Sequence, residues 1–120
     1  MEFSVRQANE TVGQRRYVTM LFSDISGSSE LAERLDAEDF SELLDAFRKV
    51  ARDTLERHGG HVARMQGDGL LATFGYPCPN EDDGRRATEA ALDLHAAAAA
   101  LDVGLTGFKL QVHSGIHAGL

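Results

Sequence analysis

Two aspartates have the side chains and the surroundings that metal-dependent phosphate chemistry needs. Asp24 follows an apolar run, and Asp68 stands between Gly67 and Gly69 in the middle of two runs that predict strands. Asp68 alone is also typical of a turn, because Asp-Gly pairs form hairpins without any chemistry, and Asp24 alone could be a simple strand-end residue before a turn. As neighbours the two acids would repel each other unless a cation lay between them. Hard divalent cations prefer such carboxylate oxygens, so the pair predicts a cation site if the fold brings it together.

A small-residue segment follows the first aspartate. Gly27, Ser28 and Ser29 come just after Asp24 and precede a segment that predicts a short helix. Backbone N–H groups at a helix N-terminus bind phosphate well, although serines there are equally typical of ordinary helix capping. The segment therefore adds a candidate phosphate cradle beside the candidate cation site.

The composition describes an ordinary globular domain and limits the function classes. The chain has 120 residues, 42% of them hydrophobic and 26% charged, with a net charge of −7. This acidity argues against a nucleic-acid-binding surface, which needs a basic face, but not against a nucleotide held through metal ions. Cys78 is the only cysteine, so no internal disulfide forms and a cytoplasmic setting is favoured. We expect no membrane segment and no signal peptide, and we interpret residues 1–16 as a linker or tail before a domain at 17–120.

The elements that must position these residues begin with a strand and a helix in two pieces. Residues 17–23 predict a buried strand, and residues 30–35 predict a short helix. Asp36 is the expected N-cap of the next helix, with Asp39 at its third position. Apolar residues then recur at helical spacing until Gly59 and Gly60 end the helix. They are Phe40, Leu43, Leu44, Phe47, Val50, Ala51 and Leu55.

The second half predicts a hairpin, a helix and a last strand. Residues 61–66 and 70–74 predict two strands joined through the turn that holds Asp68. Asn80 is the expected N-cap of a second long helix with an alanine-rich apolar stripe, and the alternation of residues 108–112 predicts a strand continuing towards Ile116. The order predicts an α+β, ferredoxin-like βαββαβ palm, with an antiparallel sheet and the helices on one face. That topology would place Asp24 and Asp68 at one end of the sheet.

With these residues in place, the sequence resembles the class III adenylate/guanylate cyclase catalytic domain. The resemblance covers residues 16–120 in consistent order. The matching runs are Phe22-Ser23-Asp24-Ile25-Ser26-Gly27-Ser28-Ser29, His58-Gly59-Gly60, Gly67-Asp68-Gly69 with Phe74-Gly75, Glu81-Asp82-Asp83, and Gly115-Ile116-His117-Ala118-Gly119.

The resemblance implies a two-metal conversion of a nucleoside triphosphate, ATP first, to its 3′,5′-cyclic monophosphate and pyrophosphate. By similarity, Asp24, Asp68 and the backbone carbonyl of Ile25 would hold two Mg²⁺ or Mn²⁺ ions. The expected substrate contacts are Gly27, Ser28, Ser29, Gly67, Arg64 and His113. Family sites form between two subunits, so the resemblance also implies a homodimer.

The chain departs from the family pattern at two substrate positions. Arg64 stands where adenylate cyclases usually carry a base-selecting lysine, so the choice between ATP and GTP stays open. Arg64 is equally interpreted as a plain surface residue of the strand. His113 stands where many members carry an arginine aimed at the triphosphate. A histidine is shorter and carries a charge only when protonated, so weaker phosphate binding is implied. His117 is interpreted as a structural strand-end residue.

The chain also stops where family members continue with further strands and a helix. Those segments supply an asparagine and an arginine that stabilise the transition state, and losing such groups costs on the order of a hundredfold each. We therefore expect a truncated domain that is inactive or nearly so by itself, with an exposed sheet edge.

Three other functions share some of these features. A regulatory or dimerisation module with a decayed site would agree with Arg64 and His113, but not with two intact aspartates. A diguanylate cyclase would need Gly-Gly-Asp/Glu-Glu-Phe, and the hairpin here has Gln-Gly-Asp-Gly-Leu. A polymerase palm also uses two acids, but a short acidic chain leaves no template-binding surface.

Overall fold

The computed structural model describes residues 18–76, 78–104 and 108–119. The linker or tail expected at 1–16 lies outside the described residues. The elements are β1 (Val18–Ile25), α2 (Ser28–Arg34), α3 (Ala37–Arg57), β2 (His61–Gln66), β3 (Gly69–Phe74), α4 (Asp83–Ala99) and β4 (Val112–Gly119). None of the described helices is both long enough and apolar enough to cross a bilayer.

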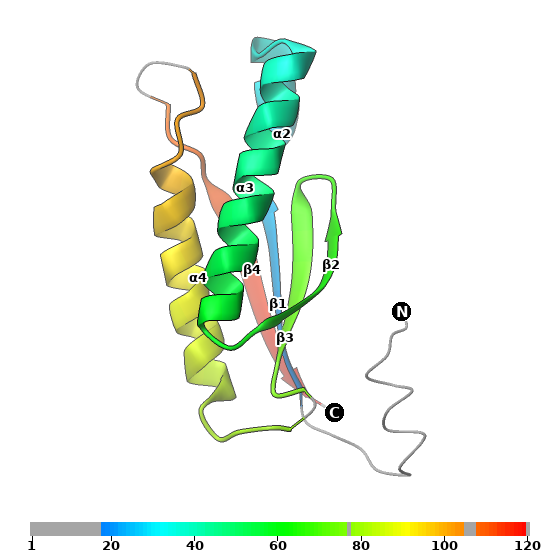
Figure 1. Ribbon diagram of the computed structural model, residues 1–120, viewed down its shortest axis with the longest axis vertical. Helices are drawn as coiled ribbons and strands as arrows, with labels where there is room; N and C mark the ends of the chain where they lie inside the picture. Colours follow the sequence, from blue (N-terminus) through cyan, green and yellow to red (C-terminus); the bar gives the residue numbers. More distant parts are fainter. Residues whose placement is uncertain (1–17, 77, 105–107, 120) are drawn as a thin grey trace.

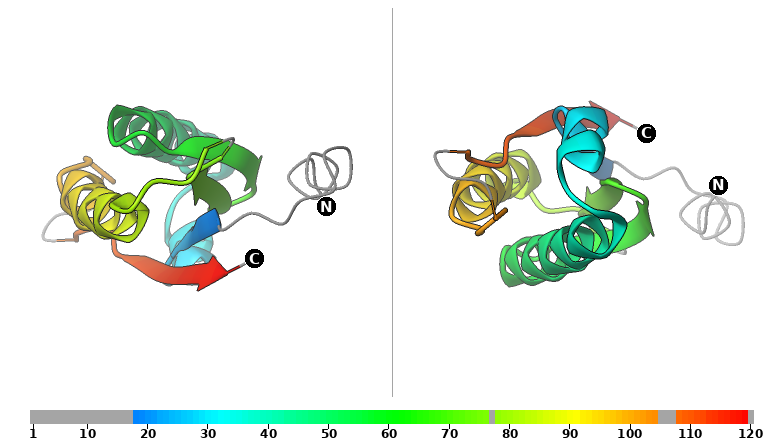
Figure 2. Two further views of the ribbon diagram at one scale, coloured as in Figure 1. Left: turned by 90° about the horizontal axis from the view of Figure 1, so that it is seen from below. Right: turned by 90° about the horizontal axis from the view of Figure 1, so that it is seen from above.

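The sheet has the strand order β2-β3-β1-β4, and each neighbouring pair is antiparallel. α3 and α4 lie side by side over one face of the sheet, and the opposite face carries no described helix (Figures 1 and 2). This arrangement confirms the predicted ferredoxin-like βαββαβ plan. It leaves one face of β1 and β3 open, and both predicted acids lie at one end of that pair of strands.

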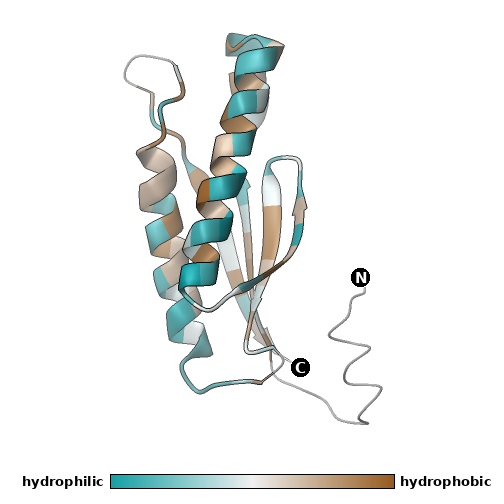
Figure 3. Cartoon of the chain, viewed as in Figure 1, coloured by the Kyte–Doolittle hydropathy of each residue, from teal (hydrophilic) through white to brown (hydrophobic). Residues whose placement is uncertain are grey.

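α3 forms because its apolar residues recur along one helical stripe. Leu43, Phe47, Ala51 and Leu55 are buried against the core, and Figure 3 shows hydrophilic and hydrophobic bands alternating along the helix. The Asp36 carboxylate accepts a hydrogen bond of 2.7 Å from the backbone N–H of Asp39, which confirms the predicted cap. Gly59, just past the end of the helix, has a φ of 86°, in the left-handed region.

α4 packs through small residues, but it does not begin as predicted. Its buried residues include Ala87, Ala90, Ala91, Leu94 and Ala98, which let the helix approach the sheet closely. The predicted Asn80 cap is wrong, because the helix begins at Asp83 and its first turn has no side-chain cap.

The reason is that Asp83 is buried and ties down the connection before the helix. Its carboxylate accepts hydrogen bonds of 2.7 Å from the Asn80 backbone N–H and 2.7 Å from Arg86. The Asn80 side chain donates instead to the carbonyl of Cys78, at 3.3 Å.

Two strand predictions also need correction. β1 is not buried on both faces, because Met20 and Phe22 are 37% and 50% exposed on the open face. The last strand begins at Val112 rather than at Phe108. Residues 108–111 pack as an irregular connection in which Leu110 is buried and the Gln111 carbonyl accepts a 2.8 Å hydrogen bond from Ser26. Alternating burial therefore occurs there without strand pairing.

Candidate functional site

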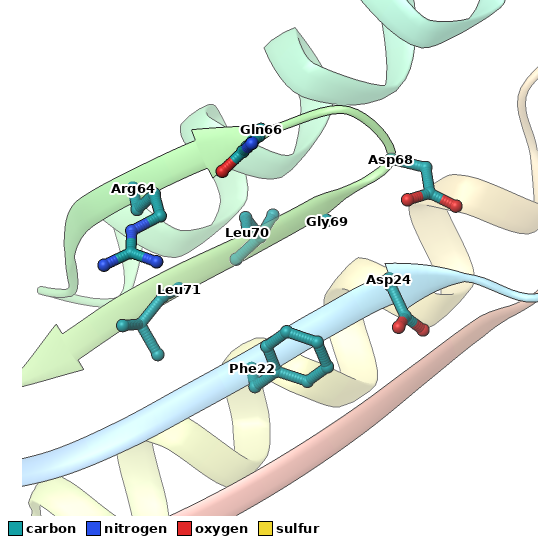
Figure 4. A pocket seen from close by; sticks show the side chains of 8 residues that line it. All are labelled: Phe22, Asp24, Arg64, Gln66, Asp68, Gly69, Leu70 and Leu71. Atoms are coloured by element: carbon teal, nitrogen blue, oxygen red, sulfur yellow. The ribbon is translucent and has the colours of Figure 1, made fainter.

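The fold brings Asp24 and Asp68 to the same end of the sheet. Asp24 is opposite Gly69 in the β1–β3 register, and Asp68 precedes that glycine in the hairpin turn. The backbone N–H of Ile25 donates to the carbonyl of Asp68 at 3.0 Å, which ties the turn to the end of β1. Figure 4 shows both carboxylates at this end of the strands. The topology thus places two half-buried acids from separate segments beside one another, as the sequence predicted.

An open hollow of about 300 Å³ extends from the two acids across the uncovered face of the sheet. Figure 4 shows the carboxylates at one end and Arg64 towards the other. Sequence reasoning missed five of the eight lining residues, although alternation along the strands places Phe22 on the face of Asp24, and Gln66 on that of Arg64. The lining residues are Phe22, Asp24, Arg64, Gln66, Asp68, Gly69, Leu70 and Leu71.

Arg64 faces this hollow rather than standing on an unrelated surface. It pairs with Leu71 across β2 and β3, just after a register shift between Val62 and Arg64. Its side chain is exposed, and it points over the same face as Phe22 and Leu71 (Figure 4). The guanidinium therefore supplies several N–H donors to whatever occupies the hollow.

The predicted phosphate cradle follows Asp24 directly in the chain. Gly27 occupies the N-cap position of α2 with a φ of 72°, in the left-handed region that favours glycine. No side chain caps this helix end, and Gly27 and Ser29 are exposed. The Ile25 side chain is buried, so this residue can contribute to a site only through its backbone.

His113 flanks the acids from the other side. It is directly opposite Asp24 in the β1–β4 register and is exposed. Directly paired residues project to the same face of a sheet, so His113 lies over the open face next to Asp24. It does not line the hollow, and any contact with a ligand there would come from the β4 side.

Gly67 has a structural role that the sequence did not reveal. Its φ is 58°, and its carbonyl accepts two hydrogen bonds from the Arg48 guanidinium on α3, at 3.1 Å and 2.7 Å. Arg48 is 19 residues away on a helix, so no local pattern in the sequence signals this contact.

The donors in this region fit a hard divalent cation. Two carboxylates and nearby backbone carbonyls are the oxygen ligands that Mg²⁺ and Mn²⁺ prefer. In the part of the chain that the structure describes, no group of three or more His, Cys, Asp or Glu side chains comes together. A cation at Asp24 and Asp68 would therefore complete its coordination with backbone oxygens, water or ligand phosphates.

The comparisons with known proteins agree with this geometry. The sequence model of the family described as "Adenylate and Guanylate cyclase catalytic domain" matches residues 11–120. An uncharacterized protein of Mycobacterium tuberculosis is 35% identical over 92 residues, which are 73% of this chain and 17% of that protein. An uncharacterized protein of Rhizobium meliloti is 33% identical over 104 residues, which are 87% of this chain and 10% of that protein.

Solved structures of both kinds of cyclase share the fold. The adenylyl cyclase CyaB from P. aeruginosa has a TM-score of 0.79 and 27% identity, covering 88% of this chain and 57% of that one. The guanylyl cyclase Cya2 has a TM-score of 0.78 and 30% identity, covering 87% of this chain and 54% of that one. The guanylate cyclase domain of RhGC from Catenaria anguillulae, in complex with GTP, has a TM-score of 0.75 and 25% identity, with coverage of 86% and 56%.

The chain thus spans little more than half of these solved domains and less than a fifth of the two curated relatives. Within that span, the family match, the antiparallel palm and the paired acids agree. The chain belongs to the adenylate and guanylate cyclase catalytic domain family.

Proposed function

We propose that this chain carries the metal- and phosphate-binding part of a nucleotidyl cyclase that converts ATP to 3′,5′-cyclic AMP and pyrophosphate. The observation that carries the proposal is the meeting of Asp24 and Asp68 at one end of the sheet, tied by the 3.0 Å bond from Ile25 to Asp68. In the described part of the chain, Arg64 is the one basic residue that lines the hollow. The two acids are therefore suited to hold cations rather than to bind a triphosphate directly.

The side chains present have separate tasks in this reaction. Asp24, Asp68 and the carbonyl of Ile25 would hold two Mg²⁺ or Mn²⁺ ions. When bound, such ions activate the ribose 3′-hydroxyl and neutralise charge on the leaving group. The 3′-oxygen then bonds to the α-phosphorus, the bond to the bridging oxygen breaks, pyrophosphate leaves, and the hydroxyl proton passes to solvent.

Substrate contacts would surround the acids. The uncapped N-terminus of α2 at Gly27, Ser28 and Ser29 offers N–H groups to a phosphate, and the Gly67 turn lies on the other side of the acids. Arg64 would contact the base across the hollow. His113, beside Asp24 on β4, would approach the triphosphate from the opposite edge.

We further propose that turnover needs a second subunit and the rest of a complete catalytic domain. The chain spans 57% of the adenylyl cyclase and 54% of the guanylyl cyclase that it resembles. Among the described residues that line the hollow, Arg64 is the one arginine and there is no asparagine, whereas the resemblance implies further transition-state donors.

An assay with two substrates tests this proposal. The chain, and a longer version extended to full domain length, are each incubated with ATP or GTP and Mn²⁺, and products are separated by HPLC. We expect cyclic AMP from the longer version only. Equal specific activity from both would contradict the requirement for the remaining domain, and no product from either would contradict the enzyme proposal.

The second candidate substrate is GTP, and one observation favours it. Arg64 is a donor-only group facing the hollow, and guanidinium groups pair with the O6 and N7 acceptors of guanine. Adenine presents a donor at the corresponding position. If the same assay gives cyclic GTP as the main product, the substrate is GTP rather than ATP, and the proposed metal site is unchanged.

A third candidate is a non-catalytic dimerisation module, favoured by the exposure of Met20 and Phe22 on the open face. Mn²⁺ binding separates it from an enzyme. A decayed module would bind Mn²⁺ equally with and without Asp24→Ala.

A further inference from the structure

The turn that carries Asp68 is open on the side where a Gly67 side chain would stand. A Cβ atom added at Gly67 would meet nothing within 4 Å, and Gly67 is exposed. Hydrogen bonds to the backbone carbonyls of the turn attach it to its neighbours. One such bond joins the Asp68 carbonyl to Ile25 at 3.0 Å.

Arg48 provides the other attachment. Its guanidinium donates through Nε and Nη2 to the Gly67 carbonyl, at 3.1 Å and 2.7 Å, from α3, which runs beside the hairpin (Figure 1). The two attachments fall on consecutive carbonyls, one directed to β1 and one to α3. The Asp68 side chain leaves the backbone between them, so its direction depends on both.

Arg48 differs from the other α3 arginine that pairs within the helix. Among the described residues, the ion-pair partner of Arg52 is Glu56, one turn away, at 3.6 Å, and the Arg52 side chain is 49% exposed. Arg48 also pairs with a neighbour in the helix, Asp45 at 3.4 Å, but it reaches a different element and is 34% exposed. Charge-assisted bonds to a single carbonyl are stronger and more directional than a solvated ion pair between exposed groups.

We propose that Arg48 is a positioning residue for Asp68: by clamping the Gly67 carbonyl it fixes the hairpin turn so that the Asp68 carboxylate is held towards Asp24 for metal binding. The inference rests on the proposed function, because it assumes that these two acids bind the cation. It adds a residue that touches neither metal nor substrate and that belongs to a helix outside the site.

The test measures Mn²⁺ binding to the 120-residue chain by the EPR signal of free Mn²⁺. Arg48→Ala removes the clamp, and Arg52→Ala removes the same charge from the same helix without touching the turn. Residues that orient metal ligands cost roughly 10–100-fold in affinity when removed, and we expect about tenfold for Arg48→Ala. We expect no measurable change for Arg52→Ala. Arg48→Lys keeps the charge but not the paired donors, so its loss should be intermediate.

A second readout follows the turn without any metal. The Ile25 amide is bonded to Asp68, so its hydrogen exchange reports whether the turn stays docked on β1. We expect faster exchange at Ile25 in Arg48→Ala and unchanged exchange in Arg52→Ala. A role limited to stability would instead lower the unfolding midpoint and accelerate exchange throughout the sheet, with Mn²⁺ affinity intact.

Asp68→Asn separates the two proposals. If Asp68→Asn abolishes Mn²⁺ binding and Arg48→Ala binds as the parent does, the positioning role is wrong and the metal site stands. If Asp68→Asn binds Mn²⁺ normally, the metal site itself is wrong, and the role of Arg48 fails with it. If both variants lose affinity, combining them should give no further loss beyond Asp68→Asn alone.

Discussion

At the scale of single residues, Asp24 and Asp68 affect the stability of the fold and its affinity for cations in opposite directions. Held at one end of the sheet, the two carboxylates repel each other when no cation is bound. Arg64, the arginine that lines the hollow, lies towards its far end and away from the two carboxylates (Figure 4). The pair should therefore reduce the stability of the metal-free protein while creating its affinity for cations.

The first prediction follows from these opposite effects. Asp24→Asn and Asp68→Asn should each weaken Mn²⁺ binding by at least about tenfold, since removing a ligand costs no less than removing a residue that orients one. Each should also raise the free energy of unfolding in EDTA, by about 0.5 kcal/mol, because two like charges held at one end of the sheet repel each other. Mn²⁺ titration and chemical denaturation measure the two effects. Asp53→Asn, an equal charge change on the exposed side of α3, is the control. Loss of stability in EDTA in both site variants would contradict the repulsion.

The aspartates could be predicted from the sequence because their signals are local. Each follows or interrupts a strand-like run, and glycines flank the second. Arg48 could not be predicted, because its partner is a backbone carbonyl on another element, which carries no signal in residue type. Of the residues that line the hollow, the sequence predicted only Asp24, Asp68 and Arg64, since the contribution of Phe22 depends on which face of β1 the helices leave uncovered.

At the scale of elements, the connections are held by glycines and buried polar groups rather than by apolar packing alone. Gly75 follows β3 with a φ of 97°, and a Cβ there would collide with the Asp83 carboxylate. Asp83 is 5% exposed and accepts hydrogen bonds from Asn80 and Arg86. The path from β3 into α4 thus depends on one residue without a side chain.

The second prediction compares two glycines in this connection. Gly75→Ala should destabilise the protein by about 2–3 kcal/mol, because it combines an unfavourable backbone conformation with a displaced buried carboxylate. Gly84→Ala should stabilise it by about 0.5–1 kcal/mol, because Gly84 is helical and a Cβ there meets nothing within 4 Å. Urea denaturation of both variants measures the difference. A neutral Gly75→Ala would show that the connection moves without cost.

A hydrogen-bonded chain links three elements beneath the site and gives the third prediction. The Ser23 and Ser114 hydroxyls lie 2.7 Å apart, and His95 lies 2.8 Å from Ser114. Ser114→Ala should cost about 2 kcal/mol, because it leaves the buried Ser23 hydroxyl without this partner. Ser23→Ala should cost only about 1 kcal/mol, because Ser114 keeps His95. Thermal unfolding of both variants checks the order, and a larger loss for Ser23→Ala would contradict it.

The helices and strands were predicted well where the apolar pattern fits one kind of structure, and badly where it fits two. α3 has an apolar stripe that only a helix satisfies, and its Asp36 cap is local. The alternation at 108–112 suits a strand, but a connection that buries Leu110 satisfies it equally. Asn80 has good capping chemistry, but the bonds to buried Asp83 decide where α4 begins.

At the scale of the whole molecule, the sheet is covered on one face and open on the other. α3 and α4 lie over one side of the sheet (Figure 2). On the uncovered side the described residues leave Met20 and Phe22 exposed, and the two acids lie at the end of the strands (Figure 4). An apolar centre bordered by polar groups is typical of a surface that meets another protein. The proposed homodimer would cover this face and place a second chain next to the hollow.

The last prediction tests that dimer with a matched pair of exposed apolar residues. Phe22 on the open face is 50% exposed, and Leu92 on α4, in the helical layer, is 66% exposed. In a twofold dimer that forms through the open face, a substitution at Phe22 removes this side chain from both halves of the interface. Burying the exposed half of each ring contributes roughly 1 kcal/mol, or about 2 kcal/mol per dimer, so Phe22→Ser should weaken dimerisation about thirtyfold. Leu92→Ser, with more exposed apolar surface to lose, should leave it unchanged. Sedimentation equilibrium measures both constants, and an effect of Leu92→Ser alone would place the interface on the helices and separate it from the aspartates.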